Sequence, residues 1–357
     1  MDKRNIYDLT YSELTYWIIE KGHTKYRASQ IWDYLYRKRV FEFKDMVDLK
    51  EECLRLLEEH FYIRCLNLYE KQESSDGTIK FLFQLKDGHL IETVMMKYEY
   101  GISVCVTSQV GCNMGCSFCA SGLLSKERDL SSGEIVGQIM QVQLYLDNKE
   151  QGERISNVVI MGIGEPFDNF SNIIYFIEII LDHKGLAIPG RCITVSTSGI
   201  PSKICKFAEI NFPVNLAISL HSPNDKMRTK IMKINSTYSI EKLMDSIKYY
   251  ISKTKRRVTI EYILLKEVND KKEDALELAS LLKEIKGNIY VNLIPYNPVD
   301  EHSQYKRSEH SSLLYFYDIL KKSNINCKIR HEHGTDIDAA CGQLRIKTIL
   351  GDIHERS

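Results

Sequence analysis

Three cysteines lie close together in the stretch VGCNMGCSFCAS, residues 110–121. They are Cys112, Cys116 and Cys119, separated first by three residues and then by two. A structural zinc site normally takes four ligands in two separated pairs, which this stretch does not supply. A [4Fe–4S] cluster gives each iron one thiolate, so three thiolates leave one iron open to bind a cofactor and pass it an electron. The spacing therefore favours a cluster over half of a zinc site or three buried apolar thiols.

Composition narrows the class of protein. The chain has 357 residues, 43% of them hydrophobic, with 48 Lys and Arg against 48 Asp and Glu. This length predicts a large domain with small appendages. The neutral balance excludes a strongly basic field over the whole protein, so any nucleic-acid binding must use local patches. No apolar run could span a bilayer and no signal-peptide core is present, so we expect a cytoplasmic protein without membrane contact, in which ten cysteines favour metal binding or catalysis over disulfides.

Helical and strand patterns alternate along most of the chain. Three amphipathic helices are expected within 7–62, and two β-rich runs flank Asp87-Gly88 within 79–96, which predicts a hairpin. Six further β-rich runs alternate with helices, which predicts an α/β fold with a parallel sheet and ligands at the carboxyl ends of its strands. Periodicity alone leaves a doubly wound sheet and a partial barrel open. The strand runs are 102–107, 157–161, 192–197, 214–219, 257–263 and 289–294, and the helical runs are 132–147, 170–182, 201–209, 239–253, 272–284 and 309–322.

Glycine-rich or polar stretches follow four of these strands. MGIGEP (161–166) follows the second strand, where glycines let the backbone approach a ligand and Glu165 can accept from an ammonium group. STSG (196–199) and SLHSPND (219–225) follow the next two and offer Ser and His to a ribose or carboxylate. Each stretch alone could be a turn or a helix cap, as could Asn297 in LIPYNP (293–298). On one rim with the cysteine loop, they predict a cofactor site.

The C-x3-C-x2-C spacing, with Phe118 before the last cysteine, resembles the signature of the radical S-adenosylmethionine (SAM) superfamily. The resemblance covers about 102–300 and implies a partial (β/α)6 barrel. It also implies that the open iron binds the amino and carboxylate groups of SAM. Reduction would then cleave SAM to a 5′-deoxyadenosyl radical.

A narrower resemblance covers nearly the whole chain. DIDAACGQL (336–344), CVTSQVGC (105–112) and the four strand-end stretches together resemble the RlmN/Cfr family of radical-SAM RNA adenine methyltransferases. The family implies four parts: an N-terminal helical domain that contacts RNA (1–75), a β-hairpin extension (76–97), the partial barrel (98–325) and a C-terminal segment (326–357).

The family also implies a mechanism and a set of site residues. One SAM methylates a tail cysteine, and a radical made from a second SAM takes a hydrogen from the S-methyl group. The methylene radical adds to an adenine ring carbon, and another cysteine releases the adduct by closing a disulfide. By motif match, Cys341 is the methyl carrier, Cys105 the resolving thiol and Glu92 the proton acceptor. The implied SAM-binding residues are Gly164, Glu165, Ser196, Ser219, Leu220, His221 and Asn297, and the cluster ligands are Cys112, Cys116 and Cys119.

Two branches of the family methylate different adenine carbons, C2 in the RlmN branch and C8 in the Cfr branch, which confers antibiotic resistance. Pro166 after the Gly-Glu pair, Ser198 in STSG and TIEYILL (259–265) resemble the C2 branch. That branch implies 23S rRNA at the peptidyl-transferase centre as substrate and, in some members, the adenosine beside a tRNA anticodon. It also implies an electron donor such as flavodoxin or ferredoxin, and we expect a monomer.

Two other classes fit parts of the pattern: a radical-SAM enzyme with a small-molecule or protein substrate, and a non-catalytic iron–sulfur or zinc protein that binds RNA. The Cys105 and Cys341 pair favours the methyltransferase, because most radical-SAM enzymes have no use for it. For RNA contact, KYRASQIWDYLYRKR (25–39) interleaves basic residues with Tyr and Trp. The mixture suits phosphate contact and base stacking, or equally an ordinary amphipathic helix, and the family resemblance favours RNA.

Overall fold

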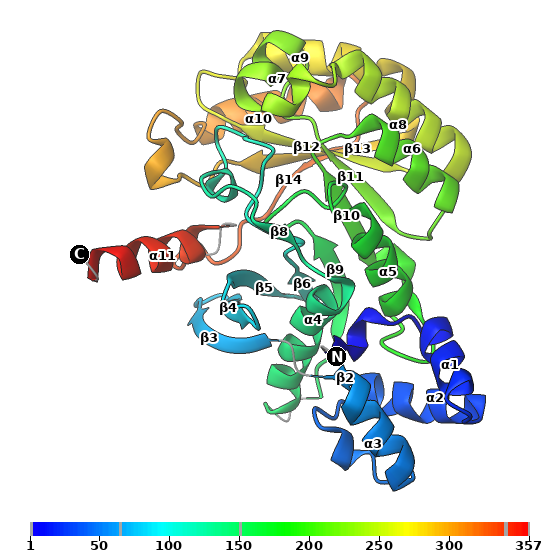
Figure 1. Ribbon diagram of the computed structural model, residues 1–357. Helices are drawn as coiled ribbons and strands as arrows, with labels where there is room; N and C mark the ends of the chain where they lie inside the picture. Colours follow the sequence, from blue (N-terminus) through cyan, green and yellow to red (C-terminus); the bar gives the residue numbers. More distant parts are fainter. Residues whose placement is uncertain (1–2, 64–65, 150–151, 339–341, 356–357) are drawn as a thin grey trace.

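A ten-stranded sheet organises the computed structural model, which describes residues 3–63, 66–149, 152–338 and 342–355 (Figure 1). Its strands lie in the order β14-β13-β12-β11-β10-β9-β6-β5-β4-β3. Every neighbouring pair from β6 to β14 is parallel. Because this part of the sheet follows the chain without reversing, it lacks the switch point of a doubly wound sheet and forms the partial barrel that the resemblance implied.

The predicted alternation of strands and helices is confirmed, and α4 begins and ends at the predicted residues. The short helix α7 (Asp225–Ile231) and the edge strand β14 (Cys327–Ile329) were not predicted, because each is shorter than the window that periodicity needs. The other parallel strands are β6 (Gly101–Cys105), β9 (Ile155–Ile160), β10 (Ile193–Thr197), β11 (Asn215–Ser219), β12 (Val258–Leu264) and β13 (Ile289–Pro295), and the helices between them are α4 (Ser132–Asp147), α5 (Phe170–Leu181), α6 (Pro201–Ile210), α8 (Ile240–Thr254), α9 (Lys272–Leu281) and α10 (His310–Lys322).

Three antiparallel strands extend the barrel sheet: β3 (Leu66–Glu73), β4 (Ile79–Leu85) and β5 (Leu90–Tyr98). The predicted hairpin joins β4 and β5, and β5 then pairs with β6, so the extension and the barrel share one sheet. Directly opposed residues of antiparallel strands point to the same face. The pairs Leu82 with Glu92 and Val94 with Cys105 therefore place the predicted carboxylate and the predicted resolving thiol on one face.

The N-terminal helices pack against α4 and α5 (Figure 1). They are α1 (Tyr11–Glu20), α2 (Lys25–Asp33), which continues as a π-helix to Lys38, and α3 (Glu51–His60). At the start of α4, the Gly133 amide donates to an Asp8 carboxylate oxygen at 2.7 Å. At the other end of α4, Arg39 binds Asp147 through two hydrogen bonds of 2.5 and 3.1 Å. Apolar residues of this region and of the barrel form one continuous core.

The aromatic residues of 25–39 do not form the base-stacking surface that the sequence suggested. Trp32, Tyr34 and Tyr36 are buried in the core, and only Tyr26 is exposed, at 64%. Trp32 and Tyr36, four residues apart, pack on each other and face Gly185 of the barrel, whereas the Tyr34 hydroxyl donates to Asp48 at 2.6 Å, so the amphipathic alternative was correct for these rings.

The C-terminal segment returns from β14 to the turn between β3 and β4. There, the Gly334 amide donates to Asp76 at 2.9 Å and the Ser75 amide donates to Asp336 at 3.0 Å. The chain then ends in α11 (Gln343–Glu355), a helix that was not predicted. The remaining strands are β1 (Arg4–Asn5), β2 (Phe61–Tyr62), β7 (Gln109–Val110) and β8 (Arg128–Asp129), and no helix within the described ranges is long and apolar enough to cross a membrane.

Candidate active site

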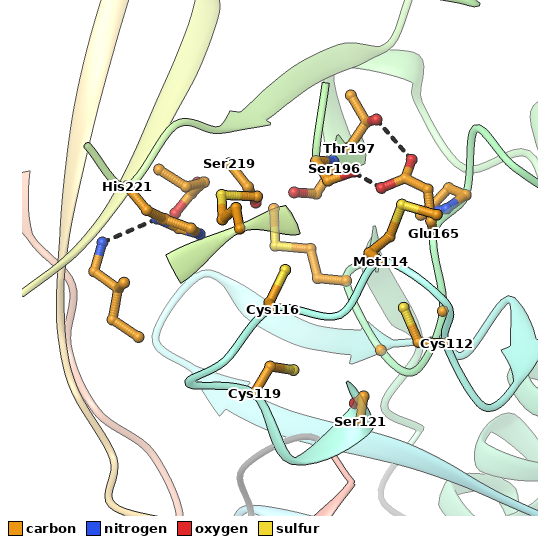
Figure 2. A pocket seen from close by; sticks show the side chains of 18 of the residues that line it. Cys112, Met114, Cys116, Cys119, Ser121, Glu165, Ser196, Thr197, Ser219 and His221 are labelled. Atoms are coloured by element: carbon orange, nitrogen blue, oxygen red, sulfur yellow. Dashed lines mark hydrogen bonds between the residues drawn. The ribbon is translucent and has the colours of Figure 1, made fainter. Parts of the chain in front are cut away.

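The three neighbouring cysteines line a cavity of about 280 Å³ at the carboxyl ends of the parallel strands (Figure 2). The loop after β6 carries the cysteines, and the loops after β9, β10 and β11 supply the opposite wall. The structure thus brings together most of the predicted cluster and SAM residues. Those that line the cavity are Cys112, Cys116, Cys119, Gly164, Glu165, Ser196, Ser219 and His221.

The cysteine loop is held by backbone contacts on both sides. Gly111 has φ +82°, and a Cβ there would lie 2.1 Å from the Ser125 carbonyl oxygen, so this position requires glycine. The Cys112 amide donates to the Leu124 carbonyl at 3.1 Å, and the Ser117 amide donates to the Ile231 carbonyl at 3.0 Å. These backbone contacts fix the loop on both sides of the first two cysteines and hold all three thiols at the cavity.

Burial controls the charge of these thiols. Burial, with a smaller contribution from the neighbouring thiols, raises the pKa of Cys112 to about 12 and the pKa of Cys116 well above its ordinary value. In the protein alone these cysteines are protonated, and only a strongly cationic ligand would make them thiolates. Within the described part of the chain, no three His, Cys, Asp or Glu side chains are close enough for a single metal ion. A cluster, in which each thiolate has its own iron, fits this donor set better.

Glu165 occupies the wall opposite the cysteines and accepts three hydrogen bonds. The donors are the Phe167 amide at 2.9 Å, the Thr197 hydroxyl at 2.6 Å and the Ser198 amide at 2.7 Å. Its complete burial nevertheless raises the pKa of the carboxyl group. These bonds join the ends of β9 and β10 and aim a carboxylate into the cavity, where it can accept from the amino group of SAM.

His221 is held as a neutral ring. Its Nδ1 accepts from the Ile263 amide at 3.1 Å, and the edge of its ring meets the ring of Phe118 at a centroid distance of 5.1 Å. Burial, together with the nearby Arg228, lowers the pKa of His221 from 6.5 to about 3. The Nε2 atom of the neutral ring therefore carries the proton and is available as a hydrogen-bond donor.

Two charged residues near the cavity were not predicted. Arg228 on α7 is completely buried and donates to the carbonyls of Ser198, Leu220 and Ser219 at 2.6, 3.1 and 3.2 Å, so it ties the ends of β10 and β11 together. Glu261 lines the cavity beside Ser219 on the neighbouring strand and accepts from the Asn292 amide group at 3.0 Å. A glutamate within the apolar run RVTIEYI was the available signal for Glu261.

A second cavity of about 280 Å³ adjoins the first and shares Phe118, Cys119 and Arg330 with it. Asn297, a predicted SAM-binding residue, lines this second cavity rather than the first. Leu220, another predicted SAM-binding residue, is buried and lines neither cavity. The second cavity is also lined by Val94 and Met96 of β5 and by His333 of the C-terminal segment.

Cys105 ends β6 and packs against residues of both cavities. Val94 and Met96 of the second cavity and Met161 of the first contact it in one apolar cluster. The thiol is buried, with 8% of the residue exposed. The predicted resolving cysteine thus lies behind the boundary between the two cavities.

Glu92 lies on the same face of the sheet but lines neither cavity. Its carboxylate accepts from the Gly342 amide at 2.6 Å and from the Arg345 amide at 2.7 Å, and lies 2.9 Å from the Lys80 ammonium. Cys341, the predicted carrier, lies outside the described residues. The contact to Gly342 nevertheless places the next residue of the chain against this carboxylate.

Comparisons with known proteins agree with this geometry. A family model for the radical SAM superfamily matches residues 106–279, and a model for the N-terminal domain of ribosomal RNA large subunit methyltransferases matches residues 4–63. A protein of Shouchella clausii named "Probable dual-specificity RNA methyltransferase RlmN" is 64% identical, over 97% of this chain and 98% of its own. The chain belongs to the RlmN family.

Two further comparisons extend the likeness. A protein of Exiguobacterium sibiricum with the same name is 59% identical over 99% of both chains. The crystal structure of a radical SAM methyltransferase from Sphaerobacter thermophilus is 38% identical, with a TM-score of 0.90 over 95% of this chain and 98% of that one. The chain is accordingly a radical-SAM RNA methyltransferase with an RNA substrate, a [4Fe–4S] cluster and SAM.

The cluster assignment predicts iron loss on removal of any one thiol. After anaerobic reconstitution with iron and sulfide, the wild-type protein should hold about four irons per chain. Cys112→Ala, Cys116→Ala and Cys119→Ala should each bind far less, whereas Cys205→Ala on α6 should bind as much as the wild type. Full iron content in any of the first three variants would contradict the assignment.

The neutral state of His221 predicts a pH-dependent stability. Below the ordinary pKa of 6.5, the unfolded chain takes up a proton at this residue that the folded chain does not, so the free energy of unfolding falls as pH falls. Between about pH 7.5 and about pH 5.5, this residue should account for a loss of about 1.4 kcal/mol. Urea unfolding of the cluster-free wild type and of His221→Gln measures it. Equal losses in both proteins would mean that His221 is not held neutral.

Proposed function

We propose that the enzyme methylates C2 of an adenosine in 23S rRNA at the peptidyl-transferase centre, and of the adenosine beside the anticodon in some tRNAs. The observation that carries this proposal is the second cavity, which lies between the cofactor cavity and the sheet residues that pack on Cys105. An adenine extruded from folded RNA can enter such a space and meet both the cofactor and the cysteine.

The lining of the second cavity suits a planar base. Val94, Met96 and Phe118 supply apolar contact, and His333 and Thr335 supply hydrogen-bonding groups. Flipped bases are held by this combination of stacking surfaces and a few polar groups. Adenine therefore has a candidate position beside the cofactor rather than in its place.

The cysteines solve a chemical difficulty. Adenine C2 is not nucleophilic, so direct methyl transfer from SAM is not open to it, whereas a carbon radical can add there. When bound, the [4Fe–4S] cluster supplies the electron that cleaves SAM to a radical. In the proposed sequence, Cys341 accepts a methyl group from one SAM, and its methylene carbon, after loss of a hydrogen atom to the radical from a second SAM, bonds to C2.

Release of the product uses the other two residues. The adduct radical must lose one electron, for which the oxidised cluster, when bound, would be the acceptor, and Glu92 would accept the C2 proton. The Cys105 thiolate then attacks the Cys341 sulfur, an S–S bond forms, and the carbon–sulfur bond breaks. The released carbon takes a proton and becomes the methyl group. Because Glu92 also accepts from the Gly342 and Arg345 amides, it can take the proton only when the C-terminal segment has released it.

The other properties proposed for the enzyme are those that the RlmN branch implies. SAM binds to Gly164, Glu165, Ser196, Ser219, Leu220, His221 and Asn297. The helical domain 1–75 contacts RNA, 76–97 is the extension, 98–325 the catalytic barrel and 326–357 the carrier segment. The enzyme acts as a monomer in the cytoplasm, and flavodoxin or ferredoxin supplies the electrons.

The position of methylation is tested by nucleoside analysis. RNA treated with the reconstituted enzyme, SAM and a reductant should yield 2-methyladenosine on digestion and mass spectrometry. If only 8-methyladenosine appeared, the inference from Pro166 and Ser198 to the C2 branch would be wrong. Absence of both products would instead favour a substrate other than RNA.

The two cysteines should differ in the step at which their variants stop. Cys341→Ala lacks the carrier and should give neither methylated RNA nor a protein–RNA adduct, with iron content unchanged. Cys105→Ala should begin the reaction and then stall with RNA bound covalently through Cys341, because no thiolate is left to attack that sulfur. Denaturing gels of both variants after reaction reveal the adduct. An adduct in both variants, or normal turnover in either, would contradict the mechanism.

A further inference from the structure

Lys80 lies where the two flanks of the carrier segment converge. It sits on β4, completely buried, on the face of the sheet that also carries Glu92, Val94 and Cys105. Its ammonium donates to the Asp338 carbonyl at 2.5 Å and lies 2.9 Å from the Glu92 carboxylate. Asp338 precedes the three residues that include Cys341, and Gly342 follows them.

We propose that Lys80 is a positioning residue for Cys341: one buried ammonium holds the segment before the cysteine directly, through the Asp338 carbonyl, and the segment after it through Glu92. This inference rests on the proposed function, because Cys341 is the methyl carrier only there. It adds a role for a residue that lines neither cavity.

Glu92 extends the constraint from Lys80 to the segment after Cys341, because its carboxylate contacts that segment. The carboxylate binds the backbone amides of Gly342 and Arg345 at the start of α11, where a helix leaves its amides without partners inside the helix. Negative charge at this end is also favoured by the helix dipole. Leu344 adds an apolar contact by packing against Leu82 and Leu90 on the same face.

The first flank is held by more than one group. The Asp338 amide donates to the Gln72 side chain at 3.1 Å, and Lys347 donates to the Asp338 carboxylate at 2.5 Å. Lys347 is more than half exposed, whereas Lys80 is completely buried. A buried, charge-assisted hydrogen bond is worth more than an exposed one, so Lys80 contributes most of the constraint.

Because both charges of the Lys80–Glu92 pair are buried, removing one of them should cost more stability than removing both. Removing the ammonium alone leaves the Glu92 carboxylate buried without its counter-ion, which is strongly destabilising, whereas replacing both members by apolar residues is often tolerated. Comparing the single with the double replacement therefore distinguishes a loss of positioning from a loss of folding. It also implies that, when the carrier segment leaves, Lys80 stays beside Glu92 as the carboxylate exchanges its amide partners for the substrate.

The test compares Lys80→Met with Lys80→Arg and with Lys347→Met as a matched surface control. One measurement is the rate at which SAM methylates Cys341, followed by mass spectrometry of the peptide that contains it. The other is hydrogen–deuterium exchange of the Gly342 and Arg345 amides. Lys80→Met should slow methylation by about tenfold or more and speed exchange by a similar factor, since small misplacements of reacting groups cost this much or more. Lys80→Arg and Lys347→Met should stay within about threefold of the wild type, because each retains the buried cation.

A second variant guards against simple misfolding. Lys80→Met with Glu92→Met removes both buried charges, so its urea unfolding midpoint should lie closer to that of the wild type than the midpoint of Lys80→Met does, yet it should still methylate Cys341 slowly. Rapid methylation in this double variant, or wild-type exchange in Lys80→Met, would overturn the proposal. If the wild-type protein itself never methylates Cys341, the proposed function fails. The exchange measurement would still decide whether Lys80 holds the segment.

Discussion

The site depends on one constraint, the unbroken order of parallel strands. Strands that run parallel in chain order end at a single rim, so loops that are distant in the sequence meet there. The loops after β6, β9, β10 and β11 supply the thiols, Glu165, Ser196 and Ser219 to one cavity. Arg228 reinforces this arrangement by binding the carbonyls at the ends of β10 and β11 from behind. A slip of any one strand would therefore remove a whole group of ligands from the cavity.

Burial gives the cavity a common electrostatic character. It raises the pKa of Cys112 and Cys116, raises that of Glu165 and Glu261, and lowers that of His221. Each shift favours the uncharged form, because each group has left water without gaining a full counter-ion. A cationic cluster and the ammonium of SAM provide the missing charges when they bind. Because the buried thiols must lose their protons to bind iron, metal binding should release protons.

The residues at the strand ends were predictable because they combine two signals, an apolar run that ends and a polar or glycine-rich stretch that follows. Gly164, Glu165, Ser196, Ser219 and His221 were found in this way and line the cavity. Arg228 was missed because an arginine on a short helix is usually solvated, and only the tertiary contacts show that it is buried. Trp32, Tyr34 and Tyr36 were misinterpreted for the opposite reason, since composition does not distinguish a stacking surface from a core face.

The contacts on either side of Cys341 could not be predicted from the sequence. The partners of Glu92 and Lys80 come from residues about 250 positions away, and no local pattern links them. Likewise β3, whose exposed residues alternate weakly, gave no clear strand signal. The motif match identified the carboxylate of Glu92, but only the pairing of β4 with β5 brings Lys80 beside it.

The attachment of the N-terminal helices to α4 has a consequence for substrate choice. Asp8 binds the start of α4, Arg39 binds its end, and the apolar residues between them belong to the same core as the barrel. Because these helices are bound to both ends of α4, the described contacts fix the span between their outer surface and the barrel mouth. If that surface binds RNA, the enzyme selects its substrate by distance. It accepts an adenosine only when the surrounding RNA fold holds it at the right distance from the bound phosphates. Two RNAs of unrelated sequence can meet this requirement equally well, provided that the distance from the bound phosphates to the adenosine is the same in both.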